Sequence, residues 1–168
     1  MIDIAFKQEE ELKKLFLETW HSDYYKFWTF GCFSDQYEAA KNTWEKTEFA
    51  SLDSQGKVIG YIAYDIDRNT RNVSGLSALN FSENKIVFGR DLLQVMKDVF
   101  EKCRFRKIDF SVICGNPIEK SYDKLVEKFG GRIVGIKTEH CRLIDGKYYD
   151  LKLYEVVNPN RRKTEDEA

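Results

Sequence analysis

Several features that define common protein classes are scarce in this sequence of 168 residues. It contains only two prolines, four cysteines and two histidines, and its apolar runs span a few residues each. Runs this short cannot cross a bilayer as a helix, so we expect no membrane span. Lysine plus arginine number 27 and aspartate plus glutamate 28, which gives a net charge of −1. This balance argues against general binding to nucleic acid or to a membrane surface.

Neither a disulfide framework nor a zinc site is expected. The cysteines and histidines are widely spaced, without a paired C-x-x-C: Cys32, Cys103, Cys114, Cys141, His21 and His140. The first residues lack a basic stretch followed by a long apolar segment, so we expect no signal peptide. The expectation is a cytoplasmic protein with reduced thiols and no metal.

The chain has enough apolar residues for a packed domain, with 42% hydrophobic and 14% aromatic residues. Its length predicts a single domain over residues 1–157, divided into a helical region (1–47) and a core (48–157). Residues 158–168 are polar and are expected to form a flexible tail.

Hydrophobic periodicity predicts an α+β domain. Helical spacing is expected at residues 9–20, 35–46, 89–102 and 117–129, and in the second of these Tyr37, Ala40 and Trp44 share one side. Alternating or β-branched stretches predict strands at residues 49–52, 57–65, 73–81, 107–114, 132–143 and 148–157. Turn residues between the strands predict two hairpins, at residues 53–56 and 144–147.

Two strand-to-helix junctions could bind a ligand. The first runs from Asn84 to Arg90, where free backbone N–H groups, Gly89 and the charges of Lys85 and Arg90 suit a phosphate. The second is Cys114-Gly115-Asn116-Pro117, followed by a helix that carries Tyr122. Both also have an ordinary structural explanation, in which Asn116 caps the helix and Tyr122 packs in the core.

Taken together, the order of elements and the two junctions resemble the GNAT superfamily of acyl-CoA-dependent N-acyltransferases. The resemblance implies a GNAT-like mixed, mainly antiparallel sheet of about six to seven strands flanked by helices. It aligns Leu92-Leu93 with the paired leucines after the family's Gln/Arg-x-x-Gly-x-Gly/Ala loop. Asn84, Val87 and Gly89 then occupy the three signature positions, and only the last is kept.

The resemblance implies transfer of an acetyl group from acetyl-CoA to an amine. The strand ending at Leu79-Asn80-Phe81 would splay from its neighbour, and a main-chain N–H near Leu79 would polarise the thioester. Asn116 would bond the pantetheine or a water, and Tyr122 would protonate the sulfur. The implied CoA-binding residues are Leu79, Phe81, Lys85, Ile86, Val87, Phe88, Gly89, Arg90 and Asn116. No general base is evident, with Glu83, Asp65, Asp109 and His140 as candidates.

The acceptor side would be formed by the aromatic residues between Tyr24 and Phe33, together with Trp44, although the explanation that we favour for these rings is that they pack the helices onto the sheet. The basic run at residues 104–107 would lie near the adenosine end of CoA. Expected partners are acetyl-CoA and a small-molecule or peptide amine, without nucleic acid or membrane, and the architecture allows a homodimer. One alternative is a degenerate GNAT-fold protein that binds CoA weakly or not at all and acts as an interaction module. Another is a small nucleic-acid-associated protein.

Overall fold

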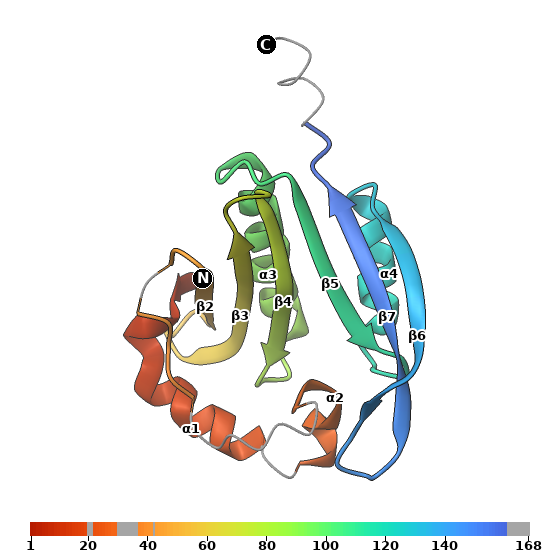
Figure 1. Ribbon diagram of the computed structural model, residues 1–168. Coiled ribbons are helices and arrows are strands. Elements are labelled where there is room, and N and C mark those ends of the chain that lie inside the picture. The colour runs from red at the N-terminus through yellow and green to blue at the C-terminus, as the bar shows by residue number, and fades with distance from the viewer. Residues whose placement is uncertain (20–21, 30–36, 42, 161–168) are drawn as a thin grey trace.

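A computed structural model describes residues 1–19, 22–29, 37–41 and 43–160. They form a seven-stranded sheet with helices on both faces, in the strand order β1-β2-β3-β4-β5-β7-β6 (Figure 1). The strands are β1 (Ile2–Ile4), β2 (Lys46–Leu52), β3 (Val58–Asp67), β4 (Asn72–Asn80), β5 (Lys107–Ile113), β6 (Arg132–Arg142) and β7 (Tyr148–Val157). The α-helices are α1 (Glu9–Thr19), α2 (Lys26–Thr29), α3 (Lys85–Glu101) and α4 (Glu119–Lys128), and the 3₁₀ turns are η1 (Ala5–Gln8) and η2 (Asp23–Tyr25).

The strand pairing confirms the expected mixed, mainly antiparallel sheet. Neighbouring strands pair antiparallel throughout, except β4 and β5, which are parallel. The two predicted hairpins connect β2 to β3 and β6 to β7. Strand β1 was not predicted; it pairs with β2, so the N-terminal region adds a strand to the sheet as well as helices.

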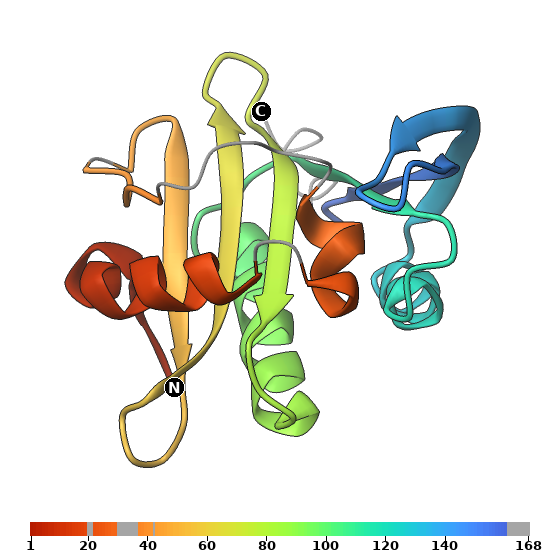
Figure 2. The same ribbon diagram turned by 90° about the horizontal axis from the view of Figure 1, so that it is seen from below.

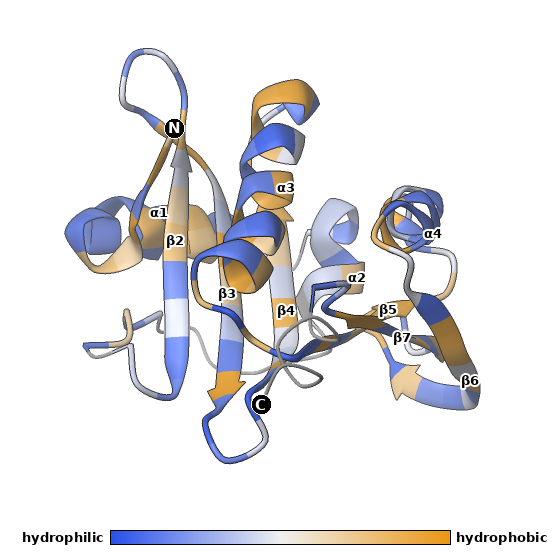
Figure 3. Ribbon diagram, turned by 90° about the horizontal axis from the view of Figure 1, so that it is seen from above, coloured by the Kyte–Doolittle hydropathy of each residue, from blue (hydrophilic) through white to orange (hydrophobic). Residues whose placement is uncertain are grey.

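Alternating side chains of the strands divide the core between the two faces of the sheet. On one face Ile62 and Phe110 pack against α3 and α4, whose inner faces are apolar (Figure 3). On the other face Tyr61 and Ala63 pack against α1 (Figure 2). A third cluster, around Ile113, lies on the α2 side of β5 and β7.

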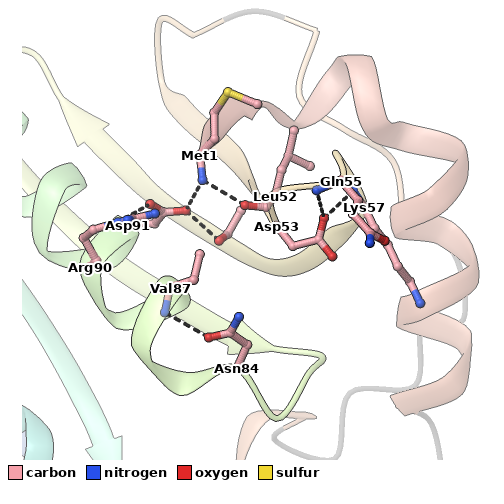
Figure 4. A network of polar contacts seen from close by, with 10 residues as sticks. Met1, Leu52, Asp53, Gln55, Lys57, Asn84, Val87, Arg90 and Asp91 are labelled. Atoms are coloured by element: carbon pink, nitrogen blue, oxygen red, sulfur yellow. Dashed lines mark hydrogen bonds and ion pairs between the residues drawn. The ribbon is translucent and has the colours of Figure 1, made fainter.

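A polar network joins the first two strands to α3. Asp91 is 4% exposed on the inner face of α3, and its carboxylate accepts hydrogen bonds from the Ser51 hydroxyl (2.8 Å) and the Met1 ammonium (3.0 Å). The same ammonium donates to the Leu52 carbonyl at 2.8 Å (Figure 4). The network supplies partners for a buried carboxylate, which would otherwise be strongly destabilising.

The segment before β2 and the segment after β7 differ from what the sequence led us to expect. The helix predicted over residues 35–46 does not form at 37–41 or 43–45, and residues 35, 36 and 42 lie outside the described ranges. There the Glu48 carboxylate accepts the Ala40 N–H at 2.6 Å, which replaces a helical hydrogen bond. Asn158, the first residue of the predicted tail, is 8% exposed, and its amide donates to the Phe105 carbonyl at 3.0 Å.

Candidate active site

The parallel strands β4 and β5 separate soon after they begin. Within the described residues they pair only at Asn72 with Lys107 and at Val73 with Ile108. The register between β3 and β4 shifts just beyond this point, where Gly75 has a φ of +61°. A bulge with glycine in the left-handed region bends its strand. We therefore attribute the splay, which the GNAT resemblance implied, to the bulge at Gly75. We call the open region between β4 and β5 the split.

The hydrogen-bond register of β4 decides which backbone groups face the split. The Phe81 N–H donates to the Ile59 carbonyl of β3 at 2.9 Å. Bonded and non-bonded pairs alternate in an antiparallel ladder. Leu79, which pairs with Tyr61, is therefore bonded to β3, and the backbone groups of Ala78 and Asn80 point toward the split. The donor expected near Leu79 belongs to these two neighbours instead.

Helix α3 begins one turn earlier than predicted. Asn84 caps it by accepting the Val87 N–H at 3.2 Å, so Lys85 is already helical and the junction loop ends before it (Figure 4). Asn84 is a favourable capping residue. Gly89 lies inside the helix, not at its start as expected. Among the described residues the Ile86 N–H has no partner, and Ile86 is 86% exposed.

The side chains at this helix start divide into supporting and exposed groups. The ring of Phe88 is buried against Gly60 of β3, where any side chain larger than hydrogen would collide with it. Lys85 and Arg90 are exposed, and the nearest carboxylate oxygen to the Arg90 guanidinium is 3.7 Å away. Two cations and the positive end of α3 therefore lie beside the split.

Asn116 is placed as a turn residue at the end of β5. Its side-chain oxygen accepts the Ile118 N–H at 3.1 Å, and its carbonyl accepts the Glu119 N–H at 2.9 Å. Gly115 precedes it with a φ of +88°, which favours glycine. The N-cap of α4 is Ile118, without a side-chain hydrogen bond, so Asn116 closes the turn before the helix and is not its cap. The amide N–H groups of Asn116 have no partner within the described residues.

The ring of Tyr122 is buried, and its hydroxyl has no hydrogen-bond partner among the described residues. Tyr122 is 6% exposed and packs edge-on against Phe110 with ring centroids 5.4 Å apart. Burial raises the pKa of the Tyr122 phenol to about 12. Within the described ranges this hydroxyl has no hydrogen-bond partner, whereas every fully buried side-chain nitrogen or oxygen there has one, so the hydroxyl must reach the surface.

The carboxylates and the histidine considered as a base are not brought together. Asp65 and Glu83 are exposed on different elements, and Asp109 forms an ion pair with Lys107 at 3.0 Å. His140 is exposed on β6, next to Glu139, whose φ is +47°. None of these placements identifies a base.

The structure shows a buried carboxylate that the sequence analysis missed. Glu48 is 4% exposed and accepts hydrogen bonds from the Tyr61 hydroxyl and the Ala40 N–H, both at 2.6 Å, while the Lys46 ammonium lies at 2.7 Å. Burial alone would raise the pKa of Glu48, but these donors outweigh it and hold the pKa below its ordinary value. The sequence feature that could have revealed Glu48 is a charged residue at an inward-facing position of a strand, here β2.

The structure separates the aromatic residues of the expected acceptor side. Trp28 packs on Phe16 of α1, with centroids 5.0 Å apart, whereas Phe27 packs against Tyr149 of β7. Trp44 lies apart, with the Arg68 guanidinium 4.6 Å from its ring. Phe30 and Phe33 are outside the described ranges.

The basic run at residues 104–107 is not beside the start of α3, as its expected role near the CoA adenosine requires. It follows the far end of α3, about 24 Å along the helix axis from Lys85. Lys107 is paired in the ladder at the closed end of the split. The expected role of this run near the adenosine therefore conflicts with a pyrophosphate site at the start of α3.

The described residues contain no group of three or more His, Cys, Asp or Glu side chains that could hold a metal ion. None of the helices in these ranges is long and apolar enough to cross a membrane.

Comparison with known proteins identifies solved structures that share this fold. No protein-family model and no curated protein matches the sequence. Among solved structures, a spermidine N-acetyltransferase from Vibrio cholerae in complex with CoA and spermine matches with a TM-score of 0.71 and 16% identity, over 94% of this chain and 95% of that one. The Vibrio cholerae spermidine/spermine N-acetyltransferase in complex with manganese ions gives a TM-score of 0.58 and 21% identity, over 73% and 71%. The chain therefore has the GNAT-like fold of these N-acetyltransferases, as its motifs led us to expect.

Proposed function

We propose that this protein transfers an acetyl group from acetyl-CoA to the nitrogen of a small-molecule or peptide amine. The split carries the proposal, because it leaves the backbone groups of Ala78 and Asn80 unpaired between two interior strands of the sheet. In the reaction the nitrogen attacks the thioester carbonyl, a C–N bond forms and the C–S bond breaks. The proton lost by the nitrogen is balanced by the one that the CoA thiolate gains.

The pantetheine arm of acetyl-CoA would lie along the free edge of β4, over the segment from Leu79 to Phe81. There the N–H groups of Ala78 and Asn80 would donate to its amides or to the thioester oxygen. A fixed donor aimed at that oxygen stabilises the charge that develops on it. The side chain of Leu79 is buried in the cluster on the α1 side of the sheet.

The pyrophosphate would lie at the start of α3. The free Ile86 N–H would donate to its oxygens and the helix dipole would attract their charge, while the Val87 N–H is held by the Asn84 cap. Lys85 and Arg90 would add positive charge. Phe88 and Gly89 would act indirectly, since Phe88 supports the helix on β3 and Gly89 keeps its outer surface small.

Tyr122 and Asn116 would act on the leaving group. A phenol with a pKa of about 12 is protonated at neutral pH, so Tyr122 can give a proton to the thiolate. The free amide of Asn116 would bond the pantetheine or an ordered water. A Tyr122→Phe variant should bind acetyl-CoA as tightly as the parent but turn over more slowly; equal turnover would exclude the acid role.

Thermal unfolding with acetyl-CoA, CoA and ATP tests the proposal. At a hundredfold excess over the dissociation constant, a ligand of the folded state stabilises it by about 2.7 kcal/mol. For a protein of this size that raises the midpoint by about 5–10 °C. A rise with acetyl-CoA and CoA that exceeds the rise with ATP supports the proposal. The absence of any rise at millimolar ligand would favour the interaction module, for which Val87 in place of the motif glycine is the sequence argument.

A homodimer through β6 is part of the same proposal. Strand β6 is at the edge of the sheet, and Ile133, Val134 and Ile136 on it are 50%, 52% and 55% exposed. Exposed apolar residues on an edge strand favour pairing with another chain. Light scattering should give twice the mass of one chain, and Ile136→Lys should reduce it. A monomer at every concentration would contradict the dimer.

A further inference from the structure

The short helix α2 connects the two halves of the sheet on the face opposite α3 and α4. It lies between β4 and the β6–β7 hairpin (Figures 1 and 2). Trp28 packs with the cluster on β2, β3 and β4, while Phe27 packs with the cluster on β5, β6 and β7. Two consecutive side chains therefore contact opposite sides of the split.

Both rings lie at the open end of the split. The Phe27 ring is 3.9 Å from the position that a Cβ atom would take on Gly115, two residues after the end of β5. The Trp28 ring packs on Phe16, which in turn packs edge-on against Phe81, directly after β4, with centroids 5.5 Å apart. A nucleophile that approached the end of the split between these two rings would contact their side chains.

A cluster of three residues fastens α2 to the hairpin. The Lys26 ammonium lies 3.0 Å from the Asp145 carboxylate, and the Tyr149 hydroxyl donates to the same carboxylate at 2.6 Å. The ammonium is also 5.7 Å from the centre of the Tyr149 ring, within the range of a cation–π contact. Asp145 therefore holds both a residue of α2 and a residue of β7.

We propose that Phe27 and Trp28 form a wall that selects the acceptor by the width of the group next to its nitrogen, and that Asp145 positions this wall through Lys26 and Tyr149. The acceptor class is then an amine with a slender, unbranched chain at the reacting nitrogen. This inference rests on the proposed function, because it takes the end of the split as the place where the thioester reacts.

Two nucleophiles of different width test the wall without knowledge of the natural acceptor. Hydroxylamine and O-benzylhydroxylamine share the same NH₂ group and are unprotonated at neutral pH. Each would form a C–N bond to the acetyl carbon and release CoA as its thiol, which a thiol reagent detects. The selectivity is the ratio of kcat/KM for hydroxylamine to kcat/KM for O-benzylhydroxylamine, after subtraction of the uncatalysed rate.

Phe27→Ala should lower this ratio by about tenfold, the discrimination typical of a small change in pocket size. Asp145→Asn should lower it in the same direction, as should 1 M salt in the parent, because screening weakens the Lys26 ion pair. Phe6→Ala is the matched control, an exposed phenylalanine of η1 at 52% exposure, and should leave the ratio unchanged. In all variants the affinity for acetyl-CoA should stay within twofold of the parent.

An unchanged ratio in both Phe27→Ala and Asp145→Asn would overturn the inference while leaving the proposed function in place. The same conclusion holds if Phe6→Ala lowers the ratio as much as Phe27→Ala. Failure of the parent protein to bind acetyl-CoA would refute the proposed function, and the inference with it. Phe27→Leu keeps an apolar side chain, and a smaller decrease in the ratio is expected for it if Phe27→Ala folds poorly.

Discussion

Substitution of Gly75 should change both the stability of the protein and its affinity for acetyl-CoA. Gly75 lies in the bulge that separates β4 from β5, with a φ of +61°. An alanine in this left-handed conformation would destabilise the folded state by about 1–2 kcal/mol. Its Cβ would also lie 2.5 Å from a carboxylate oxygen of Asp65, but that side chain is exposed and can move. We therefore assign the effect to the backbone.

The strain can be relieved if the bulge straightens, because β5 is adjacent and the ladder can extend beyond Val73. That rearrangement would narrow the split. Acetyl-CoA could then bind only after the bulge had formed again. The binding free energy would be about 1–2 kcal/mol less favourable, which corresponds to roughly 5–30-fold weaker binding. The unfolding midpoint of the free protein should fall by up to about 8 °C.

Gly56→Ala is the control for this experiment. Gly56 has a φ of +82° in the turn between β2 and β3, and no atom lies within 4 Å of its Cβ position. The control should lose similar stability and keep the affinity of the parent. Calorimetric titration with acetyl-CoA and thermal unfolding of both variants measure the two quantities. Equal affinities of Gly75→Ala and Gly56→Ala would refute the role of the bulge in forming the split.

Three further predictions concern other parts of the fold. Gly89→Ala should stabilise the protein by about 0.5–1 kcal/mol in denaturant unfolding, because Gly89 is inside α3 with open space around its Cβ position; a loss of stability would contradict this. Asp91→Ala should destabilise it by about 2–4 kcal/mol in the same assay, since a buried hydroxyl and an ammonium lose their acceptor; a loss below 1 kcal/mol would show that the network is replaceable. The Tyr149 phenol, a backbone N–H and the Lys26 ammonium lower the pKa of Asp145 to about 2. Asp145 should therefore stabilise the fold above about pH 4, and the difference in midpoint between the parent and Asp145→Asn should vanish as the pH falls toward 2.

The sequence predicts the sheet well because the strand signals are strong and local. The run Val58–Asp67 is bounded by a polar turn and forms β3, and the turn around Gly146 joins the last two strands as expected. The failures occur where a distant partner decides the structure. The segment 37–40 has a helical pattern, but Glu48 in the next element takes its backbone N–H group.

The candidate site was predictable in its location and less so in its detail. The two junctions identify where β4 and β5 end, yet the sequence pattern does not reveal that Asn84 caps α3 five residues before Gly89. The identity of the free β4 donors depends on the ladder register, which the Phe81 to Ile59 hydrogen bond sets. The ion pair between Lys26 and Asp145 connects residues 119 positions apart, and no local sequence pattern indicates it.

Residue-resolved amide exchange with and without acetyl-CoA tests the central claim most directly. If the cofactor lies along the free edge of β4, the amides of Ala78 and Asn80 should exchange quickly in the free protein and become protected when acetyl-CoA is added. The amides of Ser77 and Leu79 are already bonded to β3 and should change little. Protection of Ser77 and Leu79 alone, or no change at Ala78 and Asn80 under saturating acetyl-CoA, would contradict the account.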